Sequence, residues 1–168
     1  MKKTLLTMTI ACAILLSTSI VIAGSVKGNA EEYHYALNLC YQHTADHAKA
    51  LFAQAQKGEM NIEIAKDFVD QISSDLDHAR IYHAMVHKTY SEADSKLIAD
   101  DHLTILNGQS AASAAIASLK SEIEKSKPDA GAIKTLSATI FNAATKAVNA
   151  HLDAMKKLGI PEPQSPAL

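Results

Sequence analysis

The stretch that decides the fold runs from Asn61 to Thr89 and reads NIEIAKDFVDQISSDLDHARIYHAMVHKT. Placed on a helical wheel at ~100° per residue, its apolar side chains gather on one face. That face is centred on Phe68, Ile72, Ala79, Val86 and Tyr90. Asn61 stands at the start, where an asparagine side chain can cap the free N–H groups of a helix. We therefore predict an amphipathic helix over residues 61–89.

Two further segments carry the same helical pattern on either side of it. A helix over residues 30–57 ends at Gly58, a residue that favours helix C-termini. A helix over residues 91–125 opens with Ser91-Glu92-Ala93-Asp94, which has the form of a capping box. Asn107-Gly108 lies inside this helix and is a candidate kink or break.

A fourth helix follows Pro128-Asp129 and stops at Lys156-Lys157-Leu158-Gly159-Ile160-Pro161, where basic residues, glycine and proline come in the order of a helix end. No strand-like alternation occurs, and no proline stands between residue 24 and Pro128. Short connections make helices that follow one another antiparallel neighbours. The predicted fold is all-α, an up-down-up-down antiparallel four-helix bundle over residues 30–160, with a disordered tail at 161–168.

The first 23 residues have the layout of a secretory signal peptide. Met1-Lys2-Lys3 is basic, the segment to Ile22 is mostly apolar, and Val21-Ile22-Ala23 offers a small-residue cleavage site. A second cleavage position follows Ala30, and an uncleaved membrane anchor is the alternative. We predict cleavage, export to the periplasm or beyond, and no stable membrane span afterwards.

Cleavage after Ala23 changes both the charge and the cysteine content. It removes Lys2 and Lys3 from the 16 basic residues, which leaves 14 against 18 acidic ones. The chain carries no basic block, so nucleic acid is not an expected partner. Cys12 leaves with the signal peptide, so Cys40 has no cysteine within the chain to pair with. The oligomeric state stays open.

The chain holds eight histidines, and some fall where a core is expected. His83 and His151 lie within the apolar arcs of their helices, while His102 and Cys40 lie on the flanks of theirs. Counted from one end of the bundle, these four residues fall within ~6 Å of one level at the rise of a helix. We predict a metal site of Cys40, His83, His102 and His151, with Asp101 as a spare or supporting carboxylate.

A second candidate site lies on the seam between the first two helices. His43 and His47 are four residues apart, and Asp75 and His78 are three apart, so each pair shares a helix face. The two pairs fall at overlapping depths in an antiparallel arrangement. His34 and His87, near helix ends, are expected on the surface.

Nitrogen and sulfur ligands favour Zn²⁺ or copper, with iron as a further candidate. The alternative is that the buried histidines hydrogen-bond to one another without a metal, and that Cys40 is a small core residue. The glutamates all lie near helix ends, which argues against a ferritin-like di-iron site. No Cys-x-x-Cys-His occurs, so covalent haem is not expected.

Three functions are compatible with these features. The first is an exported bundle that binds a transition metal for storage, transport or sensing. The second is a redox protein that uses a metal or a non-covalent haem on the same bundle. The third is a metal-free interaction module with buried histidines. No catalytic residues are predicted, because the chain has no nucleophile elbow, phosphate loop or Ser/His/Asp spacing.

Overall fold

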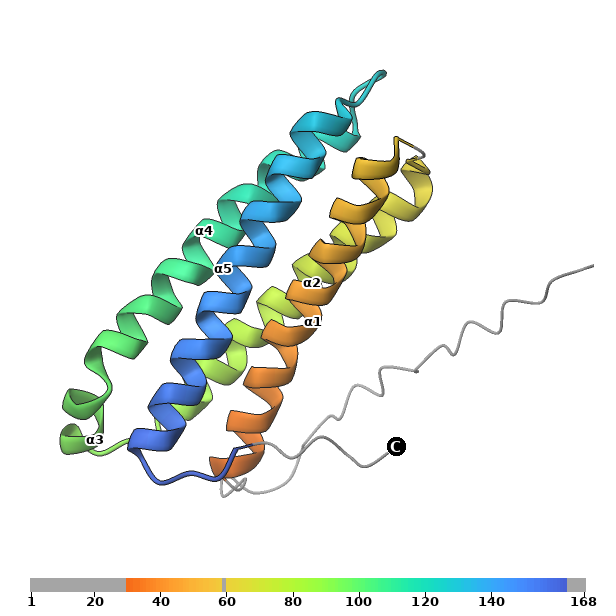
Figure 1. Ribbon diagram of the computed structural model, residues 1–168. Helices are drawn as coiled ribbons and strands as arrows, with labels where there is room; N and C mark the ends of the chain where they lie inside the picture. The colour runs from red at the N-terminus through yellow and green to blue at the C-terminus, as the bar shows by residue number, and fades with distance from the viewer. Residues whose placement is uncertain (1–29, 59, 163–168) are drawn as a thin grey trace, which may run out of the picture.

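The structure, a computed structural model, describes residues 30–58 and 60–162. The described chain forms five helices: α1 (Ala30–Lys57), α2 (Ile62–His87), α3 (Glu92–Leu97), α4 (Ala99–Ile123) and α5 (Ala130–Lys157). The four long helices pack antiparallel to their neighbours, and short α3 lies between α2 and α4 (Figure 1). The predicted all-α fold of four main helices is confirmed. The predicted signal peptide and residues 163–168 of the predicted tail lie outside the described residues.

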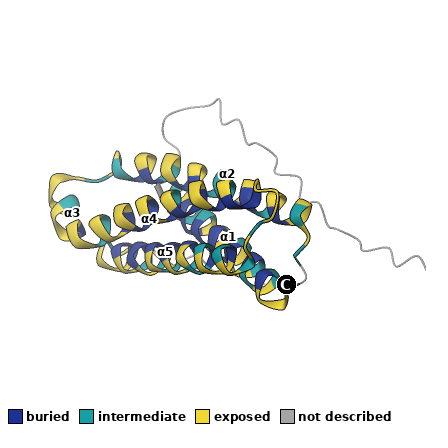
Figure 2. Ribbon diagram, turned by 90° about the horizontal axis from the view of Figure 1, so that it is seen from above, coloured by how far each residue is buried: buried dark blue, intermediate teal, exposed yellow. Residues whose placement is uncertain are grey.

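A regular stripe of buried residues explains why these helices form a bundle. In α2 the buried residues alternate at spacings of four and three: Ala65, Val69, Ile72, Leu76, Ala79, His83 and Val86. α1 has a stripe with the same spacing, beside which Asn38 and Ala45 are also buried: His34, Leu37, Tyr41, Thr44, Ala48, Leu51 and Ala55. This is the spacing that keeps one narrow seam facing partner helices along their whole length. Buried residues accordingly line the inside of the bundle, and exposed ones its outside (Figure 2).

The ends of the helices are held by the side chains that the sequence places there. Asn61 Oδ1 accepts hydrogen bonds from the N–H groups of Glu63 and Ile64 at the start of α2. Asp129 caps α5 in the same way. Gly58 and Gly159, which follow α1 and α5, have φ values of 70° and 69°, a region that favours glycine. The predicted boundaries of these helices rest on this local chemistry.

The predicted helix over residues 91–125 is interrupted at a different place from the one expected. The break falls at Ile98, which joins α3 to α4 with φ −107° and ψ 15° and is only 3% exposed. α4 runs unbroken through Asn107-Gly108, so the candidate break at this position does not occur. A Cβ at Gly108 would lie 3.0 Å from the carbonyl oxygen of Ala143 and 3.4 Å from the Cβ of Ala147. The glycine therefore serves the close approach of α4 to α5, not a kink.

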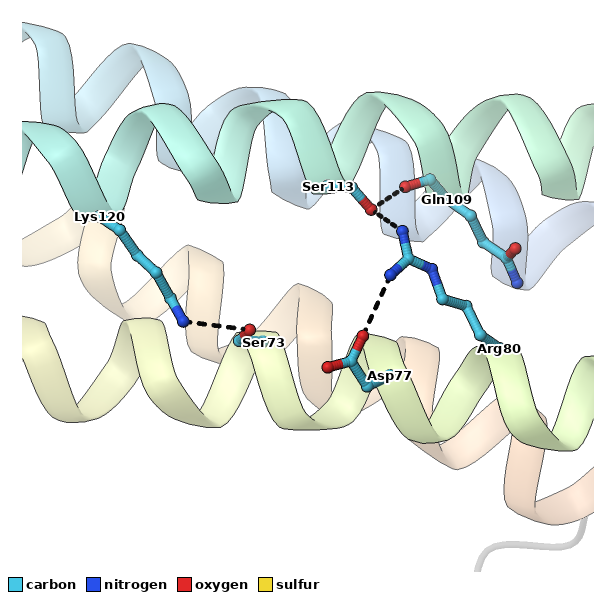
Figure 3. Close-up of polar contacts among 6 residues, drawn as sticks. All are labelled: Ser73, Asp77, Arg80, Gln109, Ser113 and Lys120. Atoms are coloured by element: carbon cyan, nitrogen blue, oxygen red, sulfur yellow. Dashed lines mark hydrogen bonds and ion pairs between the residues drawn. The ribbon is translucent and has the colours of Figure 1, made fainter.

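The seam between α2 and α4 is the least closely packed of the four. A surface hollow of about 250 Å³ opens along it, and polar side chains bridge the two helices there (Figure 3). Arg80 contacts both Asp77 on its own helix and Ser113 on α4. Lys120 on α4 donates to Ser73 on α2 at 3.3 Å. No helix in the described part of the chain is long and apolar enough to cross a membrane.

Candidate metal centre

Five histidines lie near one another at one end of the bundle. Figure 1 shows that this end also carries α3. The start of α1, the end of α2, the start of α4 and the end of α5 all lie here. Each long helix places one histidine on its core stripe, and α2 adds one more. The five are His34, His83, His87, His102 and His151.

Three of these histidines form a compact group across the α2–α4 seam. His83 and His87 are one turn apart on α2, so their side chains share a face, and His102 comes from the first turns of α4. One ring nitrogen from each lies within 4.8 Å of the other two. His87 Nε2 and His102 Nδ1 share a hydrogen bond of 2.6 Å. This triad of His83, His87 and His102 could hold a metal ion.

The three histidines of the triad differ in their exposure to solvent. His83 is 8% exposed, whereas His87 and His102 are half-buried. Burial lowers the pKa of His83 to about 4, and neighbouring His102 and His87 add to the shift. Burial, together with His87, also lowers the pKa of His102. His83 and His102 are therefore neutral near pH 7, the form of imidazole that has a lone pair for a metal.

The other two histidines form a second, inner pair. His34 Nδ1 and His151 Nε2 lie 3.0 Å apart and share a hydrogen bond between α1 and α5. Both side chains are buried, at 0% and 1% exposed. Burial lowers the pKa of His34 to about 4. Burial, with the neighbouring His34 and His83, lowers that of His151 to about 3.

Tyr90 neighbours one histidine of the triad and one of the inner pair. Its ring centroid lies 5.5 Å from that of His87 and 5.8 Å from that of His34. Burial raises the pKa of Tyr90, and Asp94 adds to the shift, so the phenol stays neutral. Tyr90 thus places an uncharged ring beside one histidine of each group, while His83 of the triad still influences His151 of the inner pair.

The residues predicted for the first site are brought together only in part. His83 and His102 belong to the triad, and His151 lies beside it in the inner pair. Cys40 is half-buried and lies off the core stripe of α1. Burial raises the pKa of its thiol to about 11, and Asp75 adds to the shift. Asp101 is paired with Lys157 of α5 at 2.5 Å and does not belong to the three-histidine group.

Of the four residues predicted for the second site, two contact each other and the other two, both histidines, are exposed. His47 Nδ1 and Asp75 Oδ2 lie 3.0 Å apart across the α1–α2 seam. His43 is exposed, and its ring centroid lies 6.1 Å from that of His47. His78 is exposed on α2. Among the described residues, only the triad brings three potential ligands within 4.8 Å of one another.

Two members of the histidine clusters were expected on the surface. For His34 that expectation was wrong, since it is fully buried, and His87 is half-buried within the triad. The signal for His34 was its place three residues before Leu37 and seven before Tyr41, which continues the core stripe of α1. The signal for His87 was its four-residue spacing from His83.

No protein-family model, curated protein or solved structure matches this chain. What the structure defines is a class: an all-α bundle whose described part carries a three-histidine group that could hold a metal ion.

Proposed function

We propose that this protein is an exported metal-binding bundle that stores, carries or senses a transition metal at His83, His87 and His102. The observation that carries the proposal is the convergence of three ring nitrogens from two helices to within 4.8 Å of one another. Three imidazoles form the donor set of a zinc or copper site, and both metals suit them better than iron.

The three ring nitrogens are close to the spacing that a bound metal needs, and small shifts of the side chains would complete the site. Ligand nitrogens ~2.0–2.1 Å from a tetrahedral zinc lie ~3.3 Å from one another. His87 and His102 would separate from their 2.6 Å contact to admit the ion, and His83 would move toward them. Small rotations of the half-buried side chains can supply such movements, because these two side chains reach the surface of the bundle.

Three protein ligands leave the fourth position of a tetrahedral ion open. Because His87 and His102 are half-buried, that open position faces the solvent side of the site. An open, accessible position favours exchange of the metal or of a small ligand over a purely structural role. This supports transport, storage or sensing more than a closed structural site.

Export is the second part of the proposal and rests on residues 1–23. Their basic start, apolar segment and Val21-Ile22-Ala23 end have the pattern that secretion machinery cleaves. A lone Cys40 with a pKa raised to about 11 keeps its thiol protonated and poorly reactive, which suits an oxidising compartment.

Metal titration of the purified protein tests the proposed triad. The stoichiometry and affinity for Zn²⁺ and Cu²⁺ are measured by calorimetry and by elemental analysis after gel filtration. We expect His87→Ala and His102→Ala each to weaken binding by about 100-fold or more, because each removes a ligand. Both side chains are half-buried, so both variants should fold.

His78→Ala serves as the matched control, because His78 lies on the same helix and is exposed. It should bind metal at the triad with the wild-type affinity. Wild-type protein that takes up neither metal, or triad variants that bind as tightly as the control, would overturn the proposal.

A further inference from the structure

The inner pair has the alignment of a linear N–H···N hydrogen bond, which is also the alignment that a two-coordinate ion between two ring nitrogens needs. The two ring centroids lie 5.2 Å apart, and the two facing nitrogens lie 3.0 Å apart. The difference is about the sum of the two distances from a ring centre to its nitrogen. The nitrogens therefore lie on the line that joins the ring centres. The ring planes differ by only 9°. His34 and His151 are thus held head to head and nearly coplanar, with Nδ1 of one aimed directly at Nε2 of the other.

Both rings of this pair are buried, and no carboxylate of the described residues is hydrogen-bonded or ion-paired to either of them. His34 Nε2 and His151 Nδ1 are buried and have no hydrogen-bond partner in the described part of the chain. After burial, His34 and His83 are the groups that lower the pKa of His151. A divalent ion with two neutral ligands would bring an uncompensated double charge into this interior, at a large cost in solvation.

We propose that His34 and His151 form a second metal position, which takes Cu(I) in linear two-coordinate form between Nδ1 of His34 and Nε2 of His151. Cu(I) is monovalent and has a filled d shell, so it accepts two opposed ligands and brings the smallest charge into the core. Zn²⁺ requires about four ligands, which the pair cannot supply. This inference extends the proposed metal binding to a second site, and it can be tested without the triad.

Binding of Cu(I) requires the rings of His34 and His151 to move slightly apart. Two nitrogens on opposite sides of an ion, each ~2.0 Å from it, are ~4 Å apart, about 1 Å more than in the hydrogen-bonded pair. Because the rings are already aligned, the movement is a separation along the line of centres with no rotation of either ring. In the hydrogen-bonded pair one ring carries its single proton on the inner nitrogen and the other ring carries its proton on the outer nitrogen. As the ion enters, the inner proton moves by exchange with solvent to the outer nitrogen of the same ring, so both rings stay neutral and no proton is lost overall.

The test uses a cysteine-free background, Cys12→Ala/Cys40→Ala, so that no thiol competes for the ion. On it, His87→Ala/His102→Ala dismantles the triad and leaves the inner pair intact. Cu(I) is added without oxygen, in competition with the chromogenic chelator bicinchoninate. We expect this triad-free protein to bind a single equivalent, with an X-ray absorption spectrum of linear Cu(I) bound by two nitrogens.

A matched pair of substitutions on α1 assigns the equivalent to the inner pair. His34→Gln in the triad-free protein should abolish Cu(I) binding, whereas His43→Gln, at an exposed position, should retain it. In the triad-containing chain, His34→Gln should leave Zn²⁺ binding unchanged. Circular dichroism checks that each variant folds. The ring nitrogen resonances of His34 and His151 in the triad-free protein give a readout that needs no buried substitution, because both inward nitrogens should shift with Cu(I).

Failure of this inference and failure of the triad are distinguishable. The inference is overturned by a folded triad-free protein that binds no Cu(I), by a spectrum with three or more ligands, or by unshifted ring nitrogens. Loss of Zn²⁺ and Cu²⁺ binding in the wild type instead contradicts the triad and leaves the Cu(I) result standing.

Discussion

The buried imidazoles tie the stability of the fold to pH. Burial lowers the pKa values of His34 and His83 to about 4 and that of His151 to about 3, against 6.5 for an unperturbed histidine. Below pH 6.5 these histidines become protonated in the unfolded chain, whereas in the folded chain they stay neutral until the pH approaches 4. The free energy of unfolding is therefore highest above pH 6.5 and falls as the pH drops toward 4. Each histidine contributes up to about 1.4 kcal/mol per pH unit in that range.

Urea denaturation of the metal-free protein at intervals from about pH 7 to about pH 4 measures this slope. His151→Leu should make the slope shallower by up to the contribution of one proton, even if the substitution changes the stability itself. His78→Ala, which alters an exposed histidine, should leave the contribution of the buried ones in place. A flat profile between pH 6.5 and 4.5, or a slope unchanged in His151→Leu, would contradict the prediction.

For individual residues, the sequence predicts that the site is built of histidines better than it predicts which residues form it. Helical wheels put His83 and His151 in core arcs, and both are buried. The α1 partner at their level is His34, whereas the prediction chose Cys40. A residue four positions into a helix was expected to be exposed, but in a bundle the ends of the neighbouring helices cover it. The contact between His34 and His151, 117 positions apart, depends on how α1 and α5 sit together, which a single-helix pattern cannot give.

Gly108 controls how closely α4 approaches α5. A side chain there would press on the backbone of Ala143, whose carbonyl oxygen lies 3.0 Å from the position of a Cβ. Gly108→Val adds further atoms to that contact, so we expect it to lower the free energy of unfolding by about 1–3 kcal/mol. Ala111→Val, on the exposed face of the same helix, is the matched control and should cost under about 0.7 kcal/mol. Urea denaturation of both variants measures the difference, and equal costs would mean that the two helices can part at no loss.

The elements differ in how far local sequence determines them. Asn61, Asp129 and the Ser91–Asp94 box mark helix starts because a capping side chain acts on its own backbone. The break at Ile98 carries no glycine or proline, and its side chain is buried against the rest of the bundle. Asn107-Gly108 was a candidate kink or break, whereas the missing side chain of Gly108 gives room to the neighbouring helix α5. Local chemistry predicts the caps, while the break and the glycine depend on packing between helices.

At the scale of the molecule, the triad lies across the least closely packed seam of the bundle, the one between α2 and α4. His83 and His87 belong to α2 and His102 to α4, and along the rest of this seam Arg80 and Lys120 bridge an open hollow with polar contacts. Exposed polar bridges contribute little to stability. A metal ion bound by ligands from both α2 and α4 would therefore add a strong connection between two helices that otherwise make few contacts with each other.

Zinc should accordingly protect this end of the molecule more than the other. At about 100 times its dissociation constant, a ligand that binds only the folded state stabilises it by about 2.7 kcal/mol. In amide hydrogen exchange we expect Zn²⁺ to slow exchange most in residues 80–87 of α2 and 99–106 of α4, which flank the triad. Residues 62–69 and 116–123, at the opposite end of the same two helices, serve as the internal control. His102→Ala should abolish the difference between the two ends. Uniform protection along both helices would show that the ion stabilises the fold without clamping the seam, and protection confined to α1 and α2 would place it at the His47–Asp75 pair instead.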